Sequence, residues 1–191
     1  MRYFLTAFVA CAILAACGNP IGLPLSASNV VDTATLYALT GTPIAKPSGY
    51  SMLIPAPVRT DLVANFDVAF DIDTTGRALL LPTAALKMGQ QSGFQISAQD
   101  FDSIRFAPTG NYNLDSAQVV HQNTVLLAHS VSVPCSFGGT AFFYAKLHVL
   151  AINPTTAYDS TAGLDARAIK FEILTDRNCG YRGLQPGLPR N

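Results

Sequence analysis

Three aspartates are the side chains most able to act in catalysis. Asp100 and Asp102 share one face of the segment QDFDSIRF, where Arg105 could pair with them across a turn, and Asp115 follows shortly after. Two carboxyl groups about 5 to 10 Å apart can cleave a glycosidic bond. Neighbours on one strand face lie near that spacing whatever their role, so these residues give only weak support to a hydrolase acting on sugar or peptide.

Two further aspartates open the run Asp-Ile-Asp-Thr-Thr-Gly at residues 71–76. This run partly matches the D-x-D-x-x-G start of a calcium loop, but the twelfth position holds Pro82 in place of the bidentate glutamate. We therefore expect a β-hairpin here, whose outer carboxylates keep the sheet soluble and discourage edge pairing.

The three histidines are His121, His129 and His148. A zinc site needs convergent lone pairs, usually with a carboxylate or thiolate as well. Strand alternation places His129 inward and His148 outward, so we expect them not to meet. We predict that His129 is a buried imidazole bonded to a backbone carbonyl or hydroxyl. The sequence thus predicts no metal site, no cofactor site and no catalytic residue.

Five tyrosines could form a surface for stacking sugars or for binding a protein, although aromatic residues on strands more often belong to a core. They are Tyr37, Tyr112, Tyr144, Tyr158 and Tyr181. The chain has no G-x-S-x-G elbow, P-loop or dinucleotide fingerprint.

The N-terminal segment has the features of a secretory signal. Arg2 precedes a short apolar run from about Phe4 to Ala16, which ends abruptly at Cys17. The tetrapeptide Leu14-Ala15-Ala16-Cys17 resembles the lipobox of bacterial lipoproteins, and we identify the chain as a lipoprotein precursor on this resemblance. The alternatives are an ordinary signal peptide with a chance cysteine, or a buried N-terminal helix.

The resemblance implies that the Cys17 thiol is joined to diacylglycerol, that the chain is cut before Cys17, and that the new amine is acylated. Two or more acyl chains anchor a protein stably. Gly18 stands where Asp would retain a Gram-negative lipoprotein at the inner membrane, so we expect the bacterial cell envelope and favour the outer membrane.

The remaining cysteines suggest a disulfide. Cys11 lies inside the signal and Cys17 takes the lipid, which leaves Cys135 and Cys179. Disulfides persist in exported proteins, so we predict that these two are joined. A metal thiolate pair or a catalytic thiol are the alternatives, but neither cysteine belongs to a C-x-x-C motif or has a histidine at zinc-ligand spacing.

Composition and periodicity favour strands. Charged residues make up 13% of the chain, against about 25% in an average globular domain, and Glu172 is the only glutamate. Cleavage of the signal peptide would remove Arg2 and leave 11 basic residues against 12 acidic ones, a balance that argues against binding to nucleic acid.

The period-two alternation predicts four strands. The clearest half-buried strand is FDVAFDID at 66–73, and the other three are TVLLAHSVSV, AFFYAKLHVLAIN and AIKFEILTD.

We expect one all-β domain, an antiparallel β-sandwich or barrel. The predicted organisation is a signal peptide at 1–16, a tether at 17–32, the β-domain at 33–184 and a frayed tail at 185–191, with the fraying starting near Gly183. The first strand is expected at 33–40 and a short helix or turn at 83–91.

These features predict a lipid-anchored envelope protein with a non-catalytic binding, scaffolding or assembly role. Its expected partners are the membrane, through the lipid, and another envelope protein, with no nucleic acid. The alternatives are an envelope hydrolase that uses carboxylates such as Asp100, Asp102 or Asp115, and a carrier with an apolar cavity for a small ligand.

Overall fold

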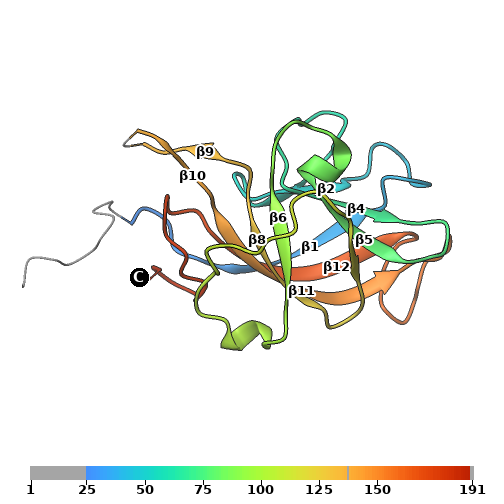
Figure 1. Ribbon diagram of the computed structural model, residues 1–191. Helices are drawn as coiled ribbons and strands as arrows, with labels where there is room; N and C mark the ends of the chain where they lie inside the picture. Colours follow the sequence, from blue (N-terminus) through green and yellow to red (C-terminus); the bar gives the residue numbers. More distant parts are fainter. Residues whose placement is uncertain (1–24, 137, 190–191) are drawn as a thin grey trace, which may run out of the picture.

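The computed structural model describes residues 25–136 and 138–189, which form an all-β domain (Figure 1). Cys17 and the other lipobox residues, like the signal segment 1–16, lie outside this range. No helix in the described part of the chain has the length and apolar character needed to cross a membrane.

Two five-stranded antiparallel sheets pack against each other as a β-sandwich, and in the described residues they do not close into a barrel. The first sheet has the order β1-β12-β11-β8-β6, with these bounds: Val31–Tyr37, Ala168–Asp176, Tyr144–Asn153, Val125–His129 and Gly93–Ser97. The second has the order β3-β2-β4-β5-β7, with these bounds: Ala56–Val58, Gly49–Ser51, Val68–Ile72, Ala78–Pro82 and Gln118–Val120. The predicted sandwich is confirmed.

Three short elements complete the fold. The hairpin of β9 (Val133–Pro134) and β10 (Thr140–Ala141) projects beyond the sheets (Figure 1). The 3₁₀ helices are η1 (Thr83–Leu86), within the predicted short helix or turn, and η2 (Phe101–Ser103).

The main core lies between the sheets. Along β4, the residues Val68, Phe70 and Ile72 face this core, as the alternation predicted. Eleven residues of the first sheet also face it: Ala34, Leu36, Phe94, Leu126, Ala128, Ala145, Leu147, Val149, Ile169, Phe171 and Ile173. The space between the sheets is therefore filled by side chains.

A second core covers the outer face of the first sheet. Val125, Leu127 and Leu174 of the sheet pack under a cover formed by Phe101, Ile104, Ala107 and Leu184. Both faces of β8 are consequently buried, which corrects the predicted orientation of His129. Leu126 and Ala128 face the space between the sheets, so His129 lies on the outer face, where it is opposite Tyr144 of β11. His148 of β11 is on the same face but opposite Val125.

Both ends of the described chain are held against the domain. Strand β1 begins at Val31, and the buried Asn29 pairs with Gly187 through two backbone hydrogen bonds of 2.7 and 2.9 Å. The expected fraying of the tail is wrong for residues 183–187, because Leu184 is fully buried and the Asn29 amide donates to the carbonyls of Gly183 and Gln185.

Candidate functional site

One end of the sandwich is built from three loops, and we call it the tyrosine end. The loop at 38–48 follows β1, the turn at 73–77 joins β4 to β5, and the loop at 154–167 joins β11 to β12. The loops at 38–48 and 154–167 meet because Tyr37 of β1 and Asn153 of β11 both pair with Ala168 of β12.

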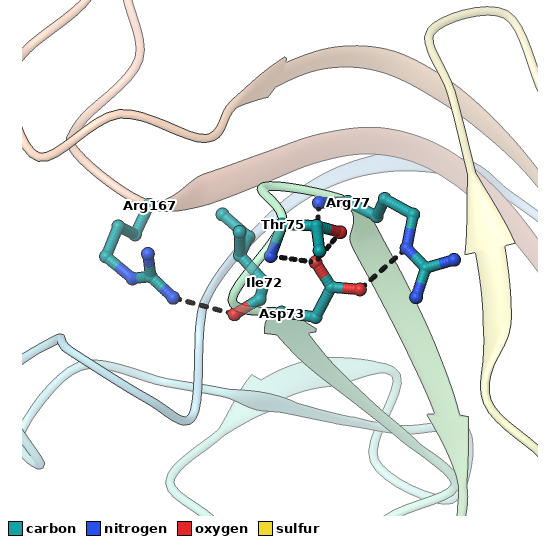
Figure 2. A network of polar contacts seen from close by, with 5 residues as sticks. All are labelled: Ile72, Asp73, Thr75, Arg77 and Arg167. Carbon is teal, nitrogen blue, oxygen red and sulfur yellow. Dashed lines mark hydrogen bonds and ion pairs between the residues drawn. The ribbon is translucent and has the colours of Figure 1, made fainter.

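Arg167 ties the loops to one another across the two sheets. Its Nε donates to the carbonyl of Thr40 and its Nη2 to the carbonyl of Ile72, each at 2.8 Å. Figure 2 shows the second of these bonds beside the Asp73 turn. The three loops are thereby held in one arrangement.

The turn at 73–77 is organised by the Asp73 carboxylate (Figure 2). It accepts the backbone N–H groups of Thr75 and Arg77 at 2.9 Å each, and the Thr75 hydroxyl and the Arg77 Nε at 2.7 Å each. These bonds, the Thr75 hydroxyl first, hold the pKa of Asp73 well below its ordinary value. The carboxylate is thus engaged by its own turn, and the predicted hairpin is confirmed.

The loop at 154–167 is fixed by the buried amide of Asn153. Its Nδ2 donates to the carbonyls of Ala157, Leu164 and Asp165 at 2.7, 3.1 and 3.0 Å. Its Oδ1 accepts the N–H and the hydroxyl of Thr155. One side chain therefore holds the loop that carries Tyr158 and Asp165.

An open hollow of about 320 Å³ lies between the loop at 38–48 and the loop at 154–167. Asp165 Oδ2 accepts the Tyr37 hydroxyl at 2.9 Å and the Lys46 ammonium at 3.2 Å, and Lys46 Nζ lies 4.5 Å from the centre of the Tyr37 ring. Tyr158 is 63% exposed at the same hollow. The lining residues are Tyr37, Gly41, Thr42, Pro43, Lys46, Tyr158, Asp165 and Ala166.

The protonation states at this hollow suit binding better than proton transfer. Partial burial, followed by the bond to Asp165, raises the pKa of Tyr37, while the Tyr37 and Lys46 bonds lower the pKa of Asp165. At neutral pH the phenol therefore stays protonated and the carboxylate stays ionised. The hollow offers an exposed ring beside a fixed pair of opposite charges.

The opposite end of the sandwich carries the disulfide, and we call it the disulfide end. Cys135 and Cys179 are joined, with their Cα atoms 6.0 Å apart, as predicted. The neighbouring Asn178 accepts the N–H groups of Ser26 and Ala27 at 2.9 and 3.0 Å. The residues predicted as the last part of a tether are thus bound to the domain here.

The histidines do not gather into one site. His129 is buried and its Nδ1 donates to the Ser130 carbonyl at 2.8 Å, which confirms the predicted backbone partner. Burial lowers its pKa. His148 Nδ1 donates to Glu172 at 2.6 Å, and His121 is exposed. Within residues 25–136 and 138–189, no three His, Cys, Asp or Glu side chains converge as metal ligands.

The aspartates considered for hydrolysis lie on the surface. Asp100 precedes η2 and Asp102 lies in it, and the described residues contain no ion pair from either to Arg105. Asp115 accepts the hydroxyl of its neighbour Ser116. None of the three lines the hollow at the tyrosine end.

Three buried charged residues were missed from the sequence: Lys146, Asp67 and Asp176. Lys146 is 2% exposed, and its ammonium donates to the carbonyls of Phe101 and Ile104 at 2.7 and 3.2 Å. Burial lowers its pKa. The alternation placed Lys146 and Asp67 on outer faces, but the covering segments are distant in sequence, so local periodicity carried no signal of their burial.

Of the five tyrosines, only Tyr37 and Tyr158 line the hollow at the tyrosine end. Tyr112 and Tyr144 pack against the second core, and Tyr181 is buried.

Neither the protein-family models nor the curated proteins contain a match to the sequence.

Proposed function

We propose that this chain is a lipid-anchored protein of the bacterial cell envelope, attached through Cys17, that binds a partner through the tyrosine end. The lipobox resemblance supports the anchor and, with Gly18, an outer-membrane location. The Cys135–Cys179 disulfide supports an oxidising compartment outside the cytoplasm.

The position of the N-terminal segment supports a defined orientation. Ser26 and Ala27 are bonded to Asn178, next to the disulfide. Figure 1 shows that the described chain starts at the same end of the domain as the β9–β10 hairpin. Nine residue steps separate Cys17 from Ser26, and an extended chain of that length spans at most about 30 Å. A lipid on Cys17 would therefore keep the disulfide end near the membrane and present the tyrosine end away from it.

The observation that carries the binding role is the fixed presentation of Tyr158 and Asp165 by the Asn153 amide. Binding costs less when the contacting groups are already ordered. A tyrosine supplies a large, rigid surface with a polar tip, and such residues are enriched at interfaces. We infer that the partner is another envelope protein, held by contact with Tyr158 and by charge pairing at Asp165 and Lys46.

The two alternative functions receive less support. A hydrolase needs catalytic groups gathered in a cleft, whereas Asp100, Asp102 and Asp115 lie on the surface outside the hollow. A carrier needs an enclosed apolar cavity, whereas the space between the sheets is occupied by fully buried side chains such as Phe94, Phe171 and Leu147.

Site-specific photo-crosslinking in cells tests the binding role. A photoreactive phenylalanine analogue in place of Tyr158 should give a discrete protein adduct, and the same analogue in place of the exposed Leu62, outside the hollow, should not. Asp165→Asn should weaken the adduct at position 158. Adducts of equal yield at the two positions, or no adduct at either position, would refute the proposed site.

The anchor has its own test. Mass spectrometry of the mature protein should find acylated Cys17 as the first residue. A Cys17→Ala variant should lose both processing and membrane attachment. A variant that still matures and stays membrane-bound would contradict the anchor without affecting the result of the crosslinking.

A further inference from the structure

A second open hollow, of about 250 Å³, lies at the disulfide end, and no part of the proposed function uses it. Leu53, Val133 and Pro134 form apolar parts of its wall. Asp67, Asn65 and Gln90 contribute polar groups to the same hollow. The combination of apolar walls and a few polar groups is typical of a site that selects its ligand by charge or hydrogen bonding.

Asp67 is a buried carboxylate without a cation. It is 2% exposed, and its Oδ2 and Oδ1 accept the N–H groups of Met52 and Val131 at 2.6 and 2.7 Å. In the described part of the chain no lysine, arginine or histidine forms an ion pair with it. A carboxylate can accept about four hydrogen bonds, so two backbone donors leave acceptor capacity unused.

Gln90 adds a second acceptor to the hollow. Its Oε1 is buried and has no hydrogen-bond partner within the described residues, while its Nε2 points to Asn65 Oδ1 at 3.5 Å. A buried acceptor left without a donor is destabilising, so such an atom calls for a partner. A carboxylate with unused acceptor capacity and an amide oxygen without a donor therefore belong to two residues that line one apolar-walled hollow.

The Asp67 backbone is held rigidly at this place. The Ser92 hydroxyl donates to the Asp67 carbonyl, and Ser92 exchanges hydrogen bonds with Thr83, at 2.9 Å from its N–H and 3.0 Å to its hydroxyl. Asp67 is thus positioned before any ligand arrives, and burial keeps its pKa above the ordinary value in the absence of a cation.

We propose that this hollow binds the side chain of a lysine from a partner polypeptide. Its ammonium group carries three donors for Asp67 and Gln90, and its alkyl stem would pack against Leu53, Val133 and Pro134. The planar fork of an arginine suits this carboxylate less well, because both Asp67 oxygens already accept backbone N–H groups. The exposed neighbours Leu53 and Ile54 provide contact surface for the chain that carries the lysine.

Titration calorimetry of the full-length protein in detergent tests this assignment. The probe is the capped tripeptide Ac-Ala-Lys-Ala-amide, and its matched control carries norleucine in place of lysine. We expect saturable binding of the lysine peptide, at least about tenfold tighter than that of the norleucine peptide, which corresponds to 1.4 kcal/mol or more. Equal binding of the two peptides would overturn the proposal.

Variants locate the binding. Two variants should each lower the affinity for the lysine peptide about tenfold or more. Gln90→Leu removes the unpartnered acceptor, and Leu53→Arg places a cation at the exposed wall of the hollow. Ile44→Arg adds the same charge at another exposed residue and should leave binding unchanged. These variants spare the Asp67 hydrogen bonds, so folding is not at risk as it is in Asp67→Asn.

Two results would reassign the ligand or the site. Butylammonium that binds as tightly as the lysine peptide would show that a small free amine, and not a polypeptide, is recognised. Binding that survives Gln90→Leu and Leu53→Arg but is lost in Asp165→Asn would place the ammonium group at the tyrosine end. Either result would overturn the proposal and leave the lipid anchor untouched.

Discussion

The carboxylate of Asp67, which directly precedes β4 in one sheet, accepts the backbone N–H of Val131, which follows β8 of the other sheet, at 2.7 Å. The same carboxylate also accepts the N–H of Met52 after β2. One side chain thus joins the two sheets at the disulfide end by hydrogen bonds, in addition to the apolar core that lies between them.

Replacement of Asp67 by Asn should lower the free energy of unfolding by about 1–3 kcal/mol. The amide keeps only one acceptor atom and sets an NH₂ group against a backbone N–H, so one buried donor loses its partner. Urea denaturation measures the change. Asp61→Asn, at an exposed aspartate bonded to Arg59, is the control and should unfold like the unaltered protein.

The cost of Asp67→Asn should also depend on pH. Burial raises the pKa of Asp67 above the ordinary value of 3.8, so from that pH upward the folded state binds the proton more tightly than the unfolded state. The stability contributed by this group is therefore greatest at acid pH and falls as pH rises through the folded pKa. The difference in free energy of unfolding between the unaltered protein and Asp67→Asn should therefore shrink as pH rises from about 4 to neutrality. A difference that grows over this range would contradict the prediction.

Removal of the disulfide should destabilise the domain. A bridge across a sequence separation of 44 residues stabilises by about 4 kcal/mol if it acts by restricting the unfolded chain. The Cys135→Ser/Cys179→Ser double variant should therefore show a much lower denaturation midpoint than the oxidised protein. Reduction of the unaltered protein is the matched comparison and should give a similar midpoint.

Asn153→Ala should release the loop that carries Tyr158. The variant loses three donated hydrogen bonds and two accepted ones, so the amides of residues 155–165 should exchange with solvent faster. Hydrogen exchange followed by mass spectrometry reports this change. Asn65→Ala, at an exposed asparagine, is the control, and equal exchange in both variants would contradict the role of Asn153.

Some of the fold follows from local patterns. The alternation correctly predicted that Val68, Phe70 and Ile72 share one face, which lies on the core between the sheets. The prediction of a half-buried strand is wrong at Ala69, which is buried on the other face. The pairing of Cys135 with Cys179 followed from their number and from the prediction that the chain is exported. The two correct predictions succeed because each depends on neighbours in sequence or on residue counts.

Other features depend on segments that meet only in the folded chain. His129 was assigned to the wrong face because the strand VLLAH at 125–129 has apolar residues on both faces. The cover over its outer face comes from residues 101–107 and Leu184. The same cover buries Lys146. Asp67 is buried because the strand ends of both sheets close around it.

The sequence by itself determined the strand-rich class, the hairpin at 73–77, the disulfide pair and the prediction of a lipid anchor at Cys17. These depend on residue type, on a period of two and on a short local motif. The tertiary structure alone decided which polar side chains are buried and which tyrosines share a hollow. The physical reason is that burial and convergence are set by contacts between residues such as Tyr37 and Tyr158, which lie far apart in sequence.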